Sequence, residues 1–147
     1  MDKLRYPIGQ FDISAAITED QLNLHILSMG SLPTKVAQAI AHLSDEQLDT
    51  PYRPGGWTVR QVVHHLPDSH LNGYTRQKLA LTEDNPTIRP YDEVAWAELP
   101  EAKTADPGIS LQLLHALHQR WILMLHQLSA EQLDRTFTHP VSGQQTI

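Results

Sequence analysis

Apolar side chains recur every three or four residues over three long stretches of the chain, a spacing typical of amphipathic helices. The first stretch predicts one bent helix over residues 18–43, because its apolar stripe keeps its phase across Pro33. The other two predict helices over residues 58–81 and 110–128. The stripe positions are Leu22, Ile26, Met29, Leu32, Val36, Ile40 and Leu43, then Val59, Val63, Leu66 and His70, then Leu114, Leu117, Trp121, Met124, Leu125 and Leu128.

Capping residues mark the predicted starts of these helices. Thr18 stands before the first, and Thr58 with Gln61 three residues later forms a capping-box pattern at the second. Ser110 is the expected cap of the third. Pro67 lies inside the second helix, where it removes one backbone donor, so we expect a kink or an interruption there.

A long proline-bearing connection, residues 89–107, is predicted between the second and third helices. We expect Trp96 and Leu99 to pin it to the bundle, and Arg89 with Asp92 to form a salt bridge within it. A connection of this length usually covers a site or an interface.

The remaining segments are short. The pattern predicts an irregular N-terminal arm, two short helical turns and a polar C-terminal turn or hairpin. They occupy residues 1–16, 44–48, 129–133 and 136–147. Three long helices amount to three-quarters of a four-helix bundle. We therefore expect a single all-α domain over residues 1–147 with the last helix absent, and an apolar groove left uncovered, which favours self-association.

Composition narrows the classes of function. The chain has 147 residues, 40% of them hydrophobic, and a formal net charge of -6. It has no Lys/Arg cluster, which argues against nucleic acid or an anionic membrane as partner. We expect no signal peptide, because no apolar run follows residues 1–5, and no bilayer-spanning segment, so a cytoplasmic location is expected. The chain has no cysteine but nine histidines, so any metal must sit on His, Asp or Glu.

Candidate chemistry is concentrated in the predicted second helix, where His64, His65, Asp68 and His70 lie within two turns. A neutral imidazole is the commonest protein metal ligand. The spacing of His64 or His65 from Asp68 suits a metal pair, but it also suits a side-chain hydrogen bond. Asp68 is the best general-base candidate by its closeness to His65, with a solvated helix residue as the alternative.

Two further features have alternative interpretations. His115 and His118, three residues apart on the third helix, would make a substitute metal pair. The structural alternative leaves His115 partly exposed and has His118 stack or hydrogen-bond within the bundle. Trp57, at the start of the second helix, would either line a pocket or act as a packing anchor.

These residues carry a resemblance that extends over nearly the whole chain. The most specific segment is Gly55 through His70. It is accompanied by Tyr6–Gly9, Gln47–Arg53, Leu79–Glu83, Ile88–Glu93, Thr104–Pro107, His118–Trp121 and Phe137–Pro140. Together they resemble the DinB-like superfamily, and within it the YfiT group of bacterial metal-dependent hydrolases.

The resemblance implies a four-helix bundle, often dimeric, in which three histidines hold a divalent metal, zinc or nickel. One ligand is the second histidine of the His-His pair, which is His65 here. The other two come from a His-x-x-x-His arrangement on the last helix. Members act on small molecules as hydrolases or attach thiols to electrophiles; with no cysteine in this chain, the thiol would come from the substrate.

The sequence departs from that pattern in two ways. It contains no His-x-x-x-His, since it stops at Ile147 where the last helix would begin, and it has Pro67 at a position usually held by a helix former. We therefore expect a divalent metal to be held weakly by this chain. The alternative function is a non-catalytic helical module that forms a homodimer.

Overall fold

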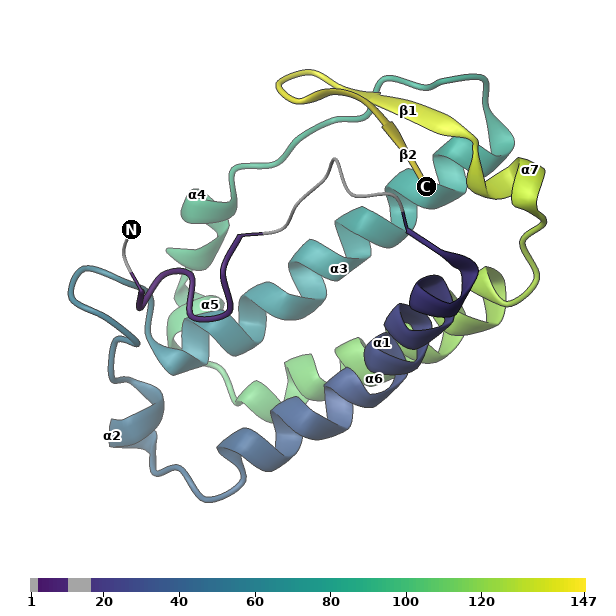
Figure 1. The fold of residues 1–147 in the computed structure, drawn as a ribbon. Helices are drawn as coiled ribbons and strands as arrows, with labels where there is room; N and C mark the ends of the chain where they lie inside the picture. Colours follow the sequence, from purple (N-terminus) through teal and green to yellow (C-terminus); the bar gives the residue numbers. More distant parts are fainter. Residues whose placement is uncertain (1–2, 11–16) are drawn as a thin grey trace.

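The computed structural model describes residues 3–10 and 17–147 and is dominated by three long helices (Figure 1). They are α1, Glu19–Ile40; α3, Val59–Thr82; and α6, Pro107–Leu125. The shorter elements are α2, Asp45–Leu48; α4, Glu93–Ala97; α5, Pro100–Thr104; α7, Ala130–Leu133; β1, Thr136–His139; and β2, Gly143–Thr146. The predicted helical bundle is confirmed, with the C-terminal segment forming a small hairpin.

The core lies where α6 packs against both α1 and α3. Leu114 of α6 is completely buried. About two turns further along the same helix, the ring of Trp121 meets the ring of Tyr74 edge-on, with the ring centroids 5.8 Å apart. Gly73 of α3 allows this approach, because a Cβ there would lie 3.0 Å from the Trp121 ring. The helices α3 and α6 are therefore held close together around an aromatic cluster.

Both prolines in the long helices are accommodated. The predicted continuity of α1 through Pro33 is confirmed. The interruption considered at Pro67 is wrong, since α3 runs unbroken for 24 residues. Pro67 is fully buried, so its ring contributes apolar burial that offsets the lost backbone hydrogen bond.

The start of the third long helix differs from the prediction. Asp106, rather than Ser110, caps α6, and its Oδ1 accepts a hydrogen bond from the Gly108 N–H at 2.8 Å. Pro107 follows at the first helical position, where its missing N–H costs nothing. Ser110 is free to bond elsewhere, and the helix ends at Leu125 instead of residue 128.

The crossover between α3 and α6 contains α4 and α5. Trp96 tilts against Tyr91 of the same segment, with ring centroids 4.6 Å apart, but both Trp96 and Leu99 are exposed, so the expected anchoring of the crossover by these two residues is wrong. The crossover is instead anchored by the buried Ala97 and Ala102. Small residues suit this position because they let α4 and α5 approach the surface of α3.

The C-terminal hairpin covers the end of α3. Thr138 of β1 accepts a hydrogen bond from the Ile88 N–H at 3.0 Å and donates one to the Pro86 carbonyl at 2.9 Å. The Arg135 guanidinium donates to the carbonyls of Ala80 and Glu83 in the last turn of α3. These bonds satisfy carbonyls that a helix end leaves without intrahelical partners.

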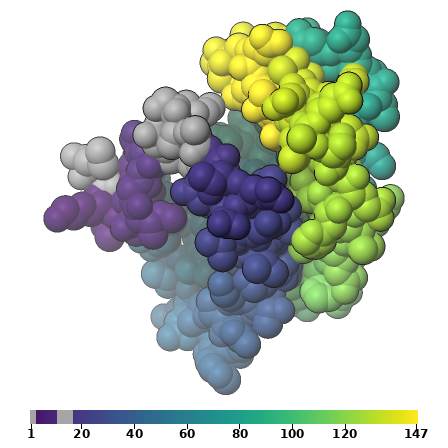
Figure 2. All heavy atoms as spheres, turned by 45° about the vertical axis from the view of Figure 1, so that its right-hand side comes forward, coloured from purple at the N-terminus to yellow at the C-terminus, as the bar shows by residue number. Residues whose placement is uncertain are grey.

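A hollow with a mixed polar and apolar lining lies at this end of the molecule, and the uncovered apolar groove expected from the sequence stays a prediction. Figure 2 shows the first turns of α1 beside the end of α6 and α7, with the hairpin above them. The hollow has a volume of about 1240 Å³. Its walls combine leucines of the helices with polar residues such as Glu19, Asn23, His126 and Asp134, together with hairpin residues.

The N-terminal arm is described only in part. Residues 1–2 and 11–16 of the predicted arm lie outside the described residues. Within residues 3–10, the Gly9 N–H donates to the Tyr6 carbonyl at 3.1 Å and closes a turn. Among the helices of the described part, none has the length and apolar character to cross a membrane.

Candidate functional site

The start of α3 is held by a reciprocal cap, as predicted. The Thr58 hydroxyl accepts from the Gln61 N–H at 3.1 Å, and the Gln61 side-chain oxygen accepts from the Thr58 N–H at 2.9 Å. Gln61 also donates through Nε2 to the Ala97 carbonyl at 2.7 Å, which ties α3 to α4. The helix that carries the candidate histidines therefore starts at a defined position.

Arg60 fixes the same end of α3 to two other parts of the chain. Its side chain is 6% exposed and donates to Asp49 at 2.7 Å, to Asp45 at 2.9 Å and to the Ala105 carbonyl at 3.1 Å. Hydrogen bonds to Asp49 and then Asp45 raise the pKa of Arg60 further. A guanidinium is suited to this position because its fork of donors reaches several acceptors at once.

Both ring nitrogens of His64 are hydrogen-bonded within the fold. It is 7% exposed, its Nε2 lies 3.2 Å from the Ala105 carbonyl, and its Nδ1 lies 2.7 Å from the Ser110 hydroxyl. The carbonyl only accepts, so Nε2 donates, and in the neutral ring Nδ1 accepts from Ser110. Neither nitrogen is left for a metal.

His65 is in the opposite situation. It is half-buried and its ring lies 4.8 Å from the Trp57 ring, yet among the described residues no protein group hydrogen-bonds either of its nitrogens. Trp57 therefore acts as a packing anchor for this imidazole. Of the two adjacent histidines, only His65 keeps a lone pair available for a ligand.

Asp68 lies one turn after His65 and is half-buried. Burial raises the pKa of the Asp68 carboxyl above its ordinary value, while the charge of His65 acts in the opposite direction. The general-base role of Asp68 stays a prediction.

His70, which is half-buried, and His118, which is buried, form a pair between α3 and α6. The His118 side chain is 1% exposed, and its Nδ1 lies 2.7 Å from the Met29 carbonyl of α1. Since that carbonyl only accepts, Nδ1 of His118 donates, and in the neutral ring Nε2 accepts from Nδ1 of His70 at 2.6 Å. The rings stack with centroids 4.8 Å apart. These contacts confirm the structural alternative for His118.

We expect this pair to make the fold less stable as the pH falls. Burial, then the charges of His118 and His65, lowers the pKa of His70 from its ordinary 6.5 to about 4. Between these values the unfolded chain binds a proton that the folded chain does not, so stability is full above 6.5 and declines toward 4. Urea denaturation at about pH 7 and about pH 5 measures the decline. His70→Gln should reduce it, and an unchanged decline in that variant would contradict the assignment.

The described residues contain no group of three or more His, Asp or Glu side chains placed to hold a metal ion. The imidazole of His65, with Asp68 one turn away, can supply one ligand to a metal ion. It does not make a complete catalytic zinc site, because such sites use three protein ligands. The substitute pair is not brought together: His115 is exposed and bonded to Gln119 at 3.0 Å, and His118 is buried.

The salt bridge predicted between Arg89 and Asp92 is wrong. Within the described part of the chain the two residues form no ion pair, because Asp92 caps α4 and its Oδ1 accepts from the Ala95 N–H at 2.9 Å. Arg89 instead lines a pocket beside α3. An aspartate directly before a short helical segment is a typical N-cap, and this position of Asp92 before α4 is the signal that would have indicated the cap.

Several residues that shape the site escaped sequence reasoning. The bonds of Arg60 to Asp45 and Asp49, and of His64 to Ser110, join segments far apart in the chain. The recurrence of apolar residues every three or four positions gives no signal for such pairs. A charged residue at a core-facing helical position is the one indication that Arg60 needed acceptors from other parts of the chain.

The protein is a helical bundle in which an imidazole without a protein hydrogen-bond partner among the described residues lies one helical turn from a half-buried carboxylate. A model of the DinB superfamily matches residues 31–147, and the chain belongs to this family. Over 144 residues it is 54% identical to proteins of Bacillus cereus and Bacillus anthracis named "Putative metal-dependent hydrolase", covering 98% of this chain and 83% of each relative.

A solved structure agrees with this assignment. It is that of YfiT from Bacillus subtilis, described as "a probable metal-dependent hydrolase with an unusual four-helix bundle topology". The TM-score is 0.95 at 52% identity, covering 98% of this chain and 83% of that one. The similarity therefore extends from the sequence to the arrangement of the helices.

Proposed function

We propose that this protein is a metal-dependent hydrolase of small molecules, in which His65 is one ligand of a divalent ion, zinc or nickel. The observation that carries the proposal is the contrast between the two adjacent histidines. His64 uses both nitrogens within the fold, whereas His65 is half-buried and keeps both available among the described residues. The names of the relatives support a divalent metal.

The chain's own groups have separate roles in this proposal. Trp57 packs on the His65 ring and limits its rotation. Asp68 accepts a proton from the attacking water, for which its raised pKa is suited. When bound, the ion would supply Lewis-acid activation for hydrolysis. The remaining ligands are not among the described residues, and the homodimer expected from the sequence stays a prediction.

Hydrolysis of nitrophenyl esters at saturating Zn(II) or Ni(II) tests the proposal. We expect metal-dependent turnover that His65→Ala abolishes and that Asp68→Asn lowers by about 100-fold, the size of effect typical of a general base. His25→Ala, which removes an exposed imidazole from α1, is the matched control and should leave the rate unchanged. Turnover that persists in a chelator, or in His65→Ala, would contradict the proposal.

A further inference from the structure

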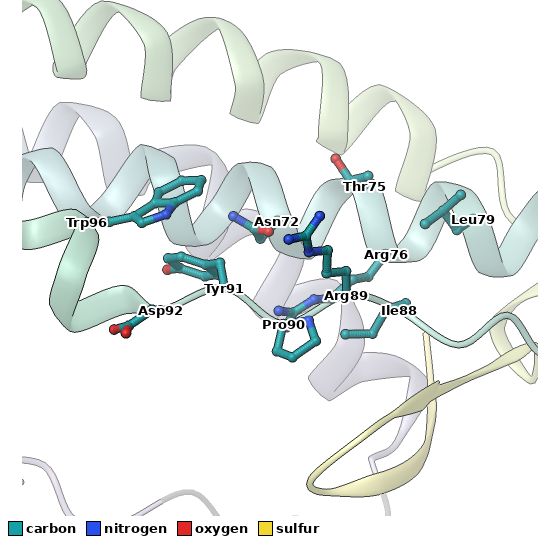
Figure 3. A pocket seen from close by; sticks show the side chains of 10 residues that line it. All are labelled: Asn72, Thr75, Arg76, Leu79, Ile88, Arg89, Pro90, Tyr91, Asp92 and Trp96. Carbon is teal, nitrogen blue, oxygen red and sulfur yellow. The ribbon is translucent and has the colours of Figure 1, made fainter.

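A second concave site lies between α3 and the crossover. It is a hollow of about 570 Å³, open to solvent, whose walls come from the middle of α3, from the segment before α4 and from α4 itself (Figure 3). The lining residues are Asn72, Thr75, Arg76, Leu79, Ile88, Arg89, Pro90, Tyr91, Asp92 and Trp96. We call it the arginine pocket.

Two guanidinium groups dominate the charge of this pocket. Figure 3 shows the side chains of Arg76 and Arg89 lying between α3 and the crossover. The Nε of Arg76 is buried and has no hydrogen-bond partner in the described part of the protein. A buried donor without a partner needs an explanation, and a bound anion supplies one. Asp92, the carboxylate on the wall, keeps its negative charge, and its Oδ1 accepts from the Ala95 N–H as the cap of α4.

The rest of the wall is suited to a planar or apolar group. The rings of Tyr91 and Trp96 lie 4.6 Å apart at 53°, and Leu79 and Ile88 add apolar surface. Asn72 donates through Nδ2 to the Asp68 carbonyl at 2.8 Å, which leaves its side-chain oxygen to accept. A pocket with an apolar wall and a few convergent polar groups is typical of small-molecule sites.

The arginine pocket continues along α3 from the candidate metal ligand. Asn72 and Arg76 follow His65 by seven and eleven residues, close to two and three whole helical turns, so they lie on nearly the same face. At 1.5 Å per residue they stand about 10 Å and about 16 Å further along the axis. Asp68 lies between His65 and Asn72 along α3.

We propose that the arginine pocket binds the anionic end of a small molecule that carries a carboxylate or phosphate on an apolar or aromatic body. Arginine recognises both groups through paired N–H donors. Resting on the proposed function, we further propose that this molecule is the substrate, with its scissile bond beside His65. The substrate class is then an ester or amide with an anionic group about 10 Å or more from the reacting carbonyl.

Binding to metal-free protein in a chelator tests the pocket without reference to catalysis. Calorimetry with phenyl phosphate, benzoate and uncharged benzyl alcohol should show binding of the two anions, and at least about tenfold weaker binding of the alcohol. Arg76→Gln and Arg89→Gln should each weaken anion binding by about tenfold or more. Arg120→Gln removes the same charge from an exposed position on α6 and should have no effect. Equal losses in all three variants, or equal binding of the alcohol, would overturn the proposal.

A kinetic experiment tests the link to the substrate. The probes are the nitrophenyl monoester of a long dicarboxylic acid and the uncharged fatty-acid ester of equal length. With metal present, Arg76→Gln should raise KM about tenfold for the charged ester alone and leave kcat unchanged. A KM unchanged for the charged ester, with metal-dependent turnover intact, would overturn the substrate assignment. Absence of any metal-dependent turnover would instead overturn the proposed function, and the calorimetric result would still decide the pocket.

Discussion

Replacing His118 with alanine is expected to lower the free energy of unfolding by about 3 kcal/mol. The imidazole is almost completely buried, donates to the Met29 carbonyl and accepts from His70, so it joins α1, α6 and α3. The change leaves a cavity and two buried polar groups without partners. Each of these effects alone costs a protein of this size a substantial part of its stability.

Urea denaturation followed by circular dichroism measures this effect. The matched control is His115→Ala, on the same helix, where the side chain is exposed and bonded only to Gln119. That change should cost less than about 0.5 kcal/mol. A loss below about 1 kcal/mol for His118→Ala, or equal losses in the two variants, would show that the buried pair does not hold the helices together.

The elements of the fold were largely predictable because they depend on local signals. The Thr58–Gln61 box acts over three residues, and the apolar stripe of α1 continues across Pro33, so both are visible in the sequence. The start of α6 was misplaced because two adjacent signals competed. The Asp106–Pro107 pair satisfied the helix start earlier than Ser110.

The candidate site was less predictable, because the roles of its histidines depend on distant partners. The spacing from Asp68 suits a metal pair equally well for His64 and for His65, and only the family resemblance favours His65. What separates them is Ser110, 46 residues further along, which bonds to His64. The partner of His70 lies 48 residues away on α6. No helical period indicates such contacts, since they arise only when α6 packs against α3.

The second large effect concerns metal affinity. The described residues supply one imidazole where a catalytic zinc site uses three protein ligands, so the 147-residue chain should bind Zn(II) or Ni(II) weakly. Extending the chain after Ile147 by a helix with a His-x-x-x-His pair, as the resemblance implies, should raise the affinity by about two orders of magnitude or more.

His65→Ala in the extended chain should abolish that gain, because the added pair then lacks its partner on α3. His115→Ala and His118→Ala are the comparison variants, and each should leave the metal affinity nearly intact wherever the protein remains folded. Circular dichroism on the same samples establishes that condition, which matters for His118 because of its buried hydrogen bonds.

Calorimetric titration of Zn(II) into the extended chain and its His65→Ala variant tests the central claim most directly. The account predicts tight one-to-one binding by the extended chain and weak binding by the variant, at the level of the 147-residue protein. Tight stoichiometric binding by the 147-residue chain that survives His65→Ala would contradict it, because His65 would then not be a ligand of the ion.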